Sequence, residues 1–313
     1  MPPGARREKI ADYLGMCGTI SWEERRIRTQ DGVELGICVS GDKGSNANTH
    51  VVILYFQGNA SSLPPRLPLL STVLGDLERI SNPQVKYTVV TLSYRGYWTS
   101  RGRASQKGLE LDALAALNWI QETYLTPISR PTQRLHSQSN NHKHILVLWG
   151  QSIGAGVATG LAAHHAEIQS VKQTSPITAL ILETPFLSIR NMLVTLYPQR
   201  WLPYRYLWPF LRNWWDSEAA LKRMGAALKN AKAPIGIGGN RSQKMPVLIV
   251  SAANDELVPV QQADRLEEIC MEAGFDVQRQ RVAGALHTDA TIRAEGRNAV
   301  VKFLKRIGEA SSL

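Results

Sequence analysis

The sequence predicts an α/β protein built around a mostly parallel sheet with helices on both faces. Three observations lead to this prediction. Apolar strand-like runs alternate with helical segments, turn residues separate the two, and several strands are hydrophobic at nearly every position. Strands buried on both faces need no polar side, which accounts for the continuous apolar runs at 51–56 and 247–250.

Strand and helix candidates follow one another in a regular order. The predicted strands lie at 32–39, 50–57, 87–94, 144–149, 178–183, 246–252 and 276–282. The predicted helices lie at 67–80, 108–125, 152–165, 256–274 and 288–307. A chain of 313 residues with 43% hydrophobic residues can form one large core, so a single domain spanning 1–313 is expected. Two polar stretches, at about 126–144 and 229–244, interrupt the pattern and are predicted to be loop insertions.

Composition narrows the functional classes. The chain carries 36 Lys and Arg against 26 Asp and Glu, a net charge of +10 that is spread along the sequence. A diffuse excess suits an anionic membrane surface or simply a solvated basic surface, and no nucleic-acid-binding motif is present, so no nucleic acid is expected as partner. Three scattered cysteines predict neither a disulfide framework nor a metal site. With no run long enough to span a bilayer, we expect a soluble or peripherally membrane-associated protein, on the cytoplasmic side.

A serine between two glycines follows the strand at 144–149. Gly150, Ser152 and Gly154 form a G-x-S-x-G pattern between that strand and the helix at 152–165. This context is typical of a nucleophile elbow, in which the serine occupies a sharp turn and the glycines keep the neighbouring backbone close. The alternative is an ordinary tight turn with no catalytic role. A nucleophilic serine needs a base nearby, so the presence of a candidate base distinguishes the two readings.

Sheet geometry selects one histidine as the base. In an open parallel sheet, ligands bind beyond the carboxyl ends of the strands, where Ser152 is expected. His287 alone follows a strand, in the loop after 276–282. The other six histidines either precede strands or lie about three turns or more along the helix of Ser152; they are His50, His136, His142, His144, His164 and His165.

Two acids follow strands on the same side of the sheet. Asp255 comes after the strand at 246–252, and the order serine, aspartate, histidine is a known triad order. Glu183 ends the strand at 178–183 and stays as the alternative acid. The oxyanion of a tetrahedral intermediate needs two N–H donors, for which we expect the main chain of Ile153 and of Asn59.

Taken together, these motifs resemble the α/β-hydrolase superfamily, and in particular the fungal bud-emergence-type hydrolases and related α/β-hydrolase-domain serine hydrolases. The matching segments are 55–62, 92–117, 149–156, 182–189, 254–259 and the loop containing His287. Two positions depart from the family pattern: Gln57 stands where relatives usually carry His, and Thr288 where they usually carry Asn.

The resemblance implies an α/β-hydrolase fold with a short aromatic-rich cap at about 186–228. Such a cap would place Trp201 and Trp208 near an acyl group, and Tyr94 is also expected among the substrate-binding residues. The alternative is that these aromatic residues only pack against the core.

The resemblance also implies a serine hydrolase that cleaves a carboxylic ester or thioester of a small-molecule or lipid acyl substrate. Catalysis through Ser152, His287 and Asp255 requires no cofactor and no metal. Peripheral membrane contact is expected from the charge. Two alternatives stay open: a serine peptidase of the prolyl-oligopeptidase type, and a non-catalytic hydrolase-fold scaffold at membranes.

Overall fold

The computed structural model describes residues 4–41, 47–59, 62–125, 143–169, 177–196, 212–230 and 244–310. Within them, the strands form one eight-stranded sheet in the order β1-β2-β4-β3-β5-β6-β7-β8. The strands are β1 Trp22–Arg28, β2 Glu34–Ser40, β3 Thr49–Phe56, β4 Val85–Leu92, β5 Lys143–Gln151, β6 Ile177–Glu183, β7 Pro246–Ala252 and β8 Asp276–Val282. β2 pairs antiparallel with β1 and β4, and every other neighbouring pair is parallel, which confirms the mostly parallel sheet.

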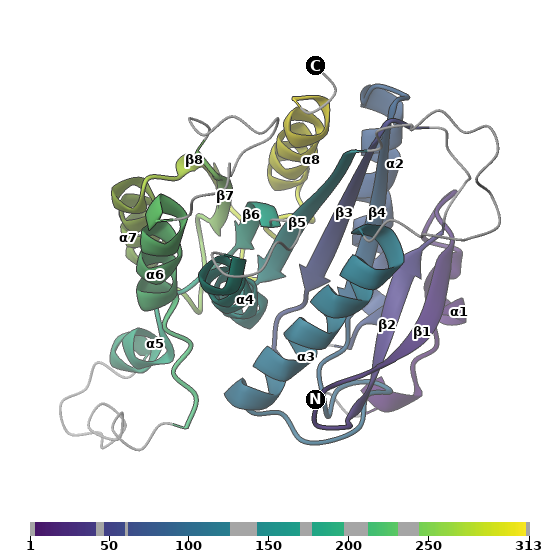
Figure 1. Cartoon of the computed structure of the whole chain (residues 1–313), viewed down its shortest axis with the longest axis horizontal. Coiled ribbons are helices and arrows are strands. Elements are labelled where there is room, and N and C mark those ends of the chain that lie inside the picture. The colour runs from purple at the N-terminus through teal and green to yellow at the C-terminus, as the bar shows by residue number, and fades with distance from the viewer. Residues whose placement is uncertain are drawn as a thin grey trace.

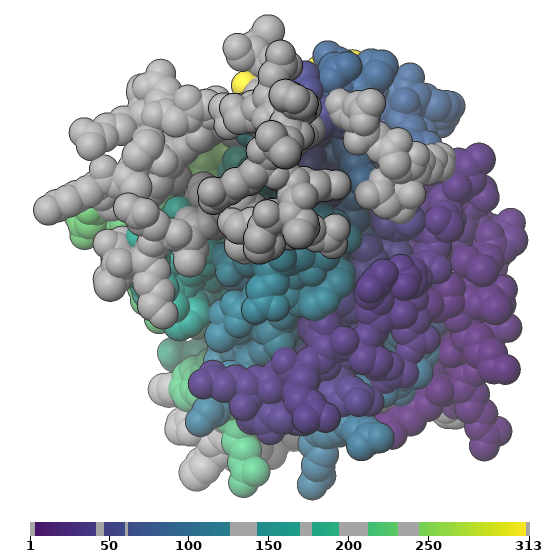
Figure 2. All heavy atoms as spheres, turned by 45° about the vertical axis from the view of Figure 1, so that its right-hand side comes forward, coloured from purple at the N-terminus to yellow at the C-terminus, as the bar shows by residue number. Residues whose placement is uncertain are grey.

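Helices cover both faces of this sheet, as Figure 1 shows for α3 and α4 on one side and α2 and α8 on the other. The α-helices are α1 Ala11–Leu14, α2 Leu67–Ile80, α3 Gln106–Ile120, α4 Ile153–Gln169, α5 Ile189–Leu196, α6 Ser217–Asn230, α7 Val260–Ala273 and α8 Ala294–Glu309. The other helical segments are the 3-10 turns η1 Ala5–Arg7 and η2 Pro64–Arg66 and the π-helical turn η3 Gln121–Leu125. In Figure 2 the N-terminal part of the chain, in purple, forms one flank of the molecule.

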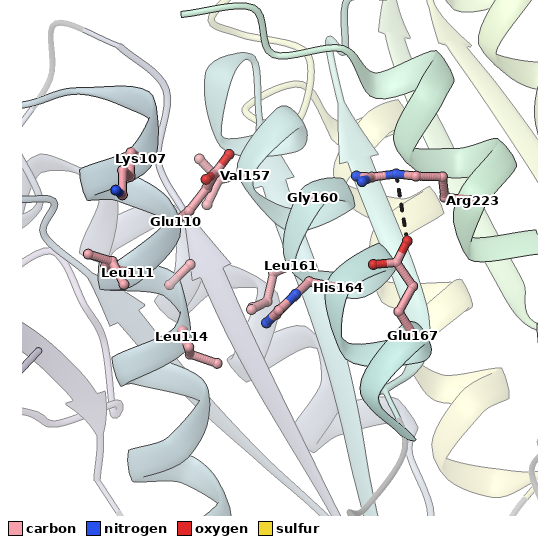
Figure 3. Close-up of a pocket in the computed structure, with 11 residues that line it drawn as sticks. Lys107, Glu110, Leu111, Leu114, Val157, Gly160, Leu161, His164, Glu167 and Arg223 are labelled. Carbon is pink, nitrogen blue, oxygen red and sulfur yellow. Dashed lines mark ion pairs between the residues drawn. The ribbon is translucent and has the colours of Figure 1, made fainter. Parts of the chain in front are cut away.

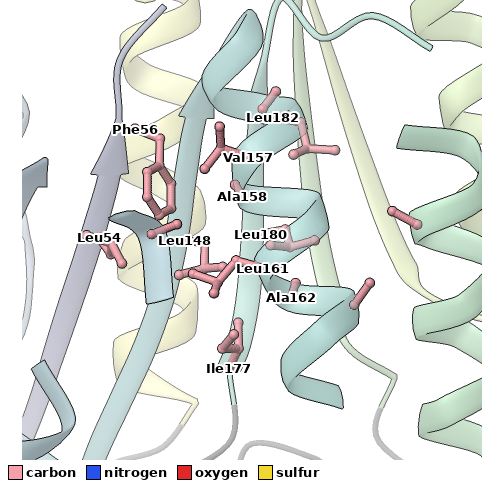
Figure 4. Close-up of a cluster of buried hydrophobic side chains, with 14 of the residues drawn as sticks. Leu54, Phe56, Leu148, Val157, Ala158, Leu161, Ala162, Ile177, Leu180 and Leu182 are labelled. Atoms are coloured by element: carbon pink, nitrogen blue, oxygen red, sulfur yellow. The ribbon is translucent and has the colours of Figure 1, made fainter. Parts of the chain in front are cut away.

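Successive side chains of the central strands belong alternately to two separate hydrophobic clusters, one on each face of the sheet. On β3, Leu54 and Phe56 point into the cluster under α3, α4, α6 and α7, whereas Ile53 and Tyr55 point into the cluster under α2 and α8. Figure 4 shows the first cluster, in which Val157 and neighbouring side chains of α4 pack against β3, β5 and β6. A strand that supplies both clusters must be apolar throughout, which is the pattern seen in the sequence.

The sequence prediction missed β1 entirely. Only Trp22 and Ile27 of this strand are buried, and its other residues are charged side chains exposed at the edge of the sheet. An edge strand with five charged residues out of seven carries little hydrophobic signal, which is why no strand is predicted there.

Several predicted boundaries are corrected. The helix predicted from residue 256 begins at Val260, and the one predicted from residue 288 begins at Ala294, because turns occupy the residues between. Of the predicted loop at 126–144, residues 143–144 belong to β5, and the remainder lies outside the described residues. Only the two ends of the predicted loop at 229–244 are described.

The predicted cap also changes at its C-terminal end. Residues from Ser217 onward form α6, which contributes buried Ala220, Leu221 and Met224 to the cluster shared with α4 and α7. Helix α6 therefore belongs to the layer that covers the sheet. Residues 197–211 of the predicted cap lie outside the described residues.

Candidate active site

Ser152 forms the turn between β5 and α4. β5 extends through Gln151, two residues further than predicted, and α4 begins at Ile153, so Ser152 alone separates strand from helix. Its φ is 54°, a left-handed conformation that a non-glycine residue rarely adopts. The Ser152 N–H donates to the Glu183 carbonyl at 2.8 Å, which fixes the turn against β6. The strained turn raises the side chain above the carboxyl end of the sheet.

The two glycines flanking Ser152 are required by close backbone contacts. A Cβ on Gly150 would lie 2.1 Å from the Gly154 carbonyl oxygen. A Cβ on Gly154 would lie 2.2 Å from the Phe56 carbonyl oxygen on β3. Because both contacts are with backbone atoms, a side chain at either position cannot be accommodated by a rotamer change.

His287 reaches Ser152 from the loop between β8 and α8. Its Nε2 lies 2.9 Å from the Ser152 Oγ, and its Nδ1 lies 2.9 Å and 3.0 Å from the two carboxyl oxygens of Asp255. The His287 and Asp255 side chains are only 5% and 4% exposed. This network assigns a proton to Nδ1, donated to Asp255, and leaves Nε2 to accept the serine hydroxyl proton. The three residues have the relative positions of a nucleophile, a base and an orienting acid.

Asp255 is held in a tight turn directly after β7. Its Oδ1 accepts the N–H of Leu257 at 2.9 Å and that of Val258 at 2.7 Å. These bonds set the direction of the carboxylate toward the imidazole.

Glu183, the alternative acid, is engaged elsewhere. Its buried carboxyl group accepts from Trp149 Nε1 at 3.1 Å, from Gln151 Nε2 at 3.2 Å and from Thr291 Oγ1 at 2.5 Å. Burial raises the pKa of Glu183 above its usual value. The acid that meets His287 is thus Asp255, whereas Glu183 ties the end of β5 to the histidine loop. Sequence reasoning did not identify Thr291, because only the fold brings this hydroxyl to β6.

Two main-chain N–H groups were predicted to hold an oxyanion. Ile153 is the first residue of α4, so its N–H has no acceptor within the helix and lies at the positive end of the helix dipole. Asn59 lies in the loop after β3. At Gly58, next to it, a Cβ would be 3.6 Å from the Ser152 Cβ, so this loop closely approaches the serine.

Tyr94 supports the loop after β3. It is 1% exposed, and its hydroxyl donates to the Gln57 carbonyl at 3.0 Å. Nearby, the Tyr97 hydroxyl donates to the Asn59 Oδ1 at 2.6 Å. The prediction that Tyr94 contacts substrate is corrected, since a fully buried ring offers no surface for a ligand.

The segment after β4 that carries these tyrosines is anchored by Arg95. The Arg95 N–H and Nε each donate to the Asp112 carboxylate on α3 at 2.8 Å, and the guanidinium also donates to Asp31 at 2.7 Å and 3.0 Å. The hydrogen bond from Arg95 lowers the pKa of Asp31 to about 2. Arg95 is therefore committed to a structural ion pair beside the tyrosines.

Trp201 and Trp208, the predicted aromatic contacts for an acyl group, lie outside the described residues. The described end of the predicted cap packs onto α4, where a Cβ on Gly156 would lie 3.4 Å from the Trp215 ring. The side chain of Gln106, at the start of α3, accepts the Trp215 N–H at 3.1 Å. The chain thus leaves the cap region along the N-terminal ends of α3 and α4.

A separate groove of about 370 Å³ lies between α3 and α4 (Figure 3). Its lining includes Leu111 and Leu114 of α3 and Leu161 of α4, with an ion pair between Arg223 and Glu167 on the rim at 3.7 Å. None of the residues Ser152, His287 and Asp255 lines it. This groove is therefore distinct from the candidate active site.

Two further observations concern only the described part of the chain. Among those residues, no group of three His, Cys, Asp or Glu side chains is arranged to hold a metal ion. No helix there has both the length and the apolar character needed to cross a bilayer.

Relatives of this chain include hydrolases. The Bem46 protein of Schizosaccharomyces pombe is 29% identical over 254 residues, covering 81% of this chain and 67% of that protein. The lysophosphatidylserine lipase ABHD12 of Danio rerio is 31% identical over 228 residues, covering 72% of this chain. The matched region is 49% of that lipase, so this chain corresponds to about half of it. No protein-family model matches the chain.

Solved structures share the fold. An esterase of Pyrococcus furiosus aligns over 94% of this chain and 95% of its own, with a TM-score of 0.58 and 17% identity. An α/β hydrolase of Vibrio vulnificus aligns over 98% and 89%, with a TM-score of 0.63 and 16% identity. The sheet, the elbow motif and these relatives agree: the chain belongs to the α/β-hydrolase superfamily and is related to the fungal Bem46 protein.

Proposed function

We propose that this protein is a serine hydrolase that cleaves the carboxylic ester or thioester of an acyl substrate. The observation that carries the proposal is the 2.9 Å approach of His287 Nε2 to the Ser152 Oγ, with Asp255 on the opposite ring nitrogen. A serine hydroxyl is a weak nucleophile unless a base removes its proton, and this geometry supplies the base. The name of the ABHD12 relative, a lysophosphatidylserine lipase, supports a lipid acyl ester as the substrate class.

The mechanism follows from the positions of these groups. Ser152 Oγ attacks the acyl carbonyl while its proton passes to His287 Nε2, and Asp255 stabilises the imidazolium. The N–H groups of Ile153 and Asn59 stabilise the oxyanion of the tetrahedral intermediate. Collapse of that intermediate breaks the bond to the alcohol or thiol, which takes the proton from Nε2. Water then attacks the acyl-enzyme, with His287 again accepting a proton, and releases the carboxylic acid.

A fluorophosphonate probe tests the proposal directly, because such probes phosphonylate only an activated serine. We expect the purified protein to be labelled and the S152A variant to remain unlabelled while keeping the same circular dichroism spectrum. Absence of labelling in folded wild-type protein would contradict the proposal and favour a non-catalytic scaffold. Labelling that persists in S152A would place the nucleophile elsewhere.

The acyl group is expected to bind through apolar contact. In a series of p-nitrophenyl esters from acetate to octanoate, kcat/KM should rise by up to about fourfold for each methylene that becomes buried, since each contributes about 0.8 kcal/mol. Flat or falling kcat/KM beyond acetate would contradict an acyl-binding site. The matched octanoyl thioester, measured under the same conditions, compares ester with thioester preference.

A further inference from the structure

The loop that carries His287 contains no regular secondary structure. It runs from residue 283 to residue 293, between β8 and α8. Its position depends on specific hydrogen bonds, because an irregular loop has no ladder of its own to hold it. One of these is between backbone groups, from the Asn254 N–H to the Ala285 carbonyl at 2.9 Å. Carboxylate side chains also accept main-chain N–H groups of this loop: Glu295 that of Ala283, Asp289 that of Leu286 and Glu256 that of His287.

Glu256 accepts the main-chain N–H of His287 itself. The Glu256 Oε2 lies 2.9 Å from the His287 nitrogen. Asp255, the preceding residue, contacts the imidazole ring of the same histidine. Two consecutive carboxylates therefore hold His287 at two points, one at its backbone and one at its ring.

These two contacts restrict different freedoms of the histidine. The hydrogen bond that the imidazole donates to Asp255 sets the rotation of the ring about its side-chain torsions. It cannot set the position of the His287 Cα, on which the distance from Nε2 to the Ser152 Oγ also depends. The hydrogen bond from the His287 N–H to Glu256 restrains that main-chain position. The turn after β7 holds the neighbouring Asp255 carboxylate through the N–H groups of Leu257 and Val258.

We propose that Glu256 is a positioning residue that fixes the backbone of His287 so that its ring stays within proton-transfer distance of Ser152. This inference rests on the proposed serine-hydrolase function. Because the Glu256 side chain is exposed, substitutions there should leave the fold intact, so an effect on rate can be separated from an effect on folding. Glutamine keeps an oxygen acceptor of the same reach, whereas alanine removes it.

The test compares E256A and E256Q with a matched control, E295A. Glu295 is also exposed, and it likewise accepts a main-chain N–H of this loop, that of Ala283 at 3.1 Å, four residues before His287. For hydrolysis of p-nitrophenyl butyrate, we expect E256A to lower kcat about tenfold with KM unchanged, because a displaced base slows only the chemical step. E256Q should remain within about twofold of the wild type, and so should E295A.

Melting temperatures of the variants report whether the fold is intact, and fluorophosphonate labelling rates report the reactivity of Ser152. The labelling rate of E256A should fall in parallel with kcat. Equal losses of kcat in E256A and E295A would overturn the proposal in favour of general loop stabilisation, and so would an unchanged kcat in E256A or a failure of E256Q to restore activity. If the wild type itself is not labelled, the proposed function fails and this inference fails with it; a labelled wild type with a normal E256A rejects the inference alone.

Discussion

The H287A variant is expected to lose about 10⁶-fold in kcat for ester hydrolysis, close to the loss expected for S152A, because the two residues act as one unit. His287 Nε2 lies 2.9 Å from the Ser152 Oγ and is the base in the proposed mechanism. Without it, the serine hydroxyl keeps its proton at neutral pH and attacks the acyl carbonyl only slowly. D255N should lose less, about 10⁴-fold, because the imidazole remains but its favoured tautomer is lost.

Steady-state kinetics with p-nitrophenyl butyrate measure these losses, and His164 supplies the matched control. His164 lies on α4, the helix that follows Ser152, and it lines the groove of Figure 3. H164A should retain wild-type kcat. A loss below about tenfold in H287A would show that another group serves as base. The E183Q variant distinguishes the two acids. If Glu183 were the catalytic acid, E183Q would lose as much kcat as D255N.

The G154A variant is expected to lower the free energy of unfolding by more than about 3 kcal/mol, or to prevent folding. The new Cβ would lie 2.2 Å from the Phe56 carbonyl oxygen and 2.7 Å from that of Gln57. Both are backbone atoms at the end of β3, so relief requires moving α4 away from the central strand. That movement would also displace Ser152, and any folded G154A protein should label poorly with the fluorophosphonate probe.

Urea denaturation measures this effect, with G160A as control on the same helix. At Gly160 a Cβ meets no atom within 4 Å outside the helix backbone. Alanine there should be neutral or stabilise by about 0.5–1 kcal/mol, because it improves helix propensity without a clash. Similar unfolding free energies for G154A and G160A would contradict the close approach of α4 to β3.

The sequence alone predicted the parallel sheet and the order of its central elements. Continuous apolar runs such as 51–56 report burial on both faces, which is a local property of the chain. Ser152 is identifiable from a local pattern as well, because the tight turn requires a glycine two positions before it and another two positions after it. His287 followed from topology, since it is the histidine that comes after a strand rather than before one.

The choice between Asp255 and Glu183 needed the tertiary structure. Both acids follow strands at the same edge, and the sequence holds no information on where each carboxylate points. The structure directs Asp255 to the imidazole and directs Glu183 to Trp149 and Gln151. Likewise, Tyr94 reads from the sequence as a candidate contact at a strand end, and only packing shows it buried.

The sequence by itself determined the fold class and the candidate residues for the proposed chemistry. Both depend on local patterns, namely the periodicity of buried residues and the turns that require glycine. What only the tertiary structure decided is which groups meet: Thr291 with Glu183, and Glu256 with the backbone of His287. These contacts join residues separated by 108 and 31 positions. Their partners are set by how irregular loops pack at the end of the sheet, and no local pattern encodes that packing.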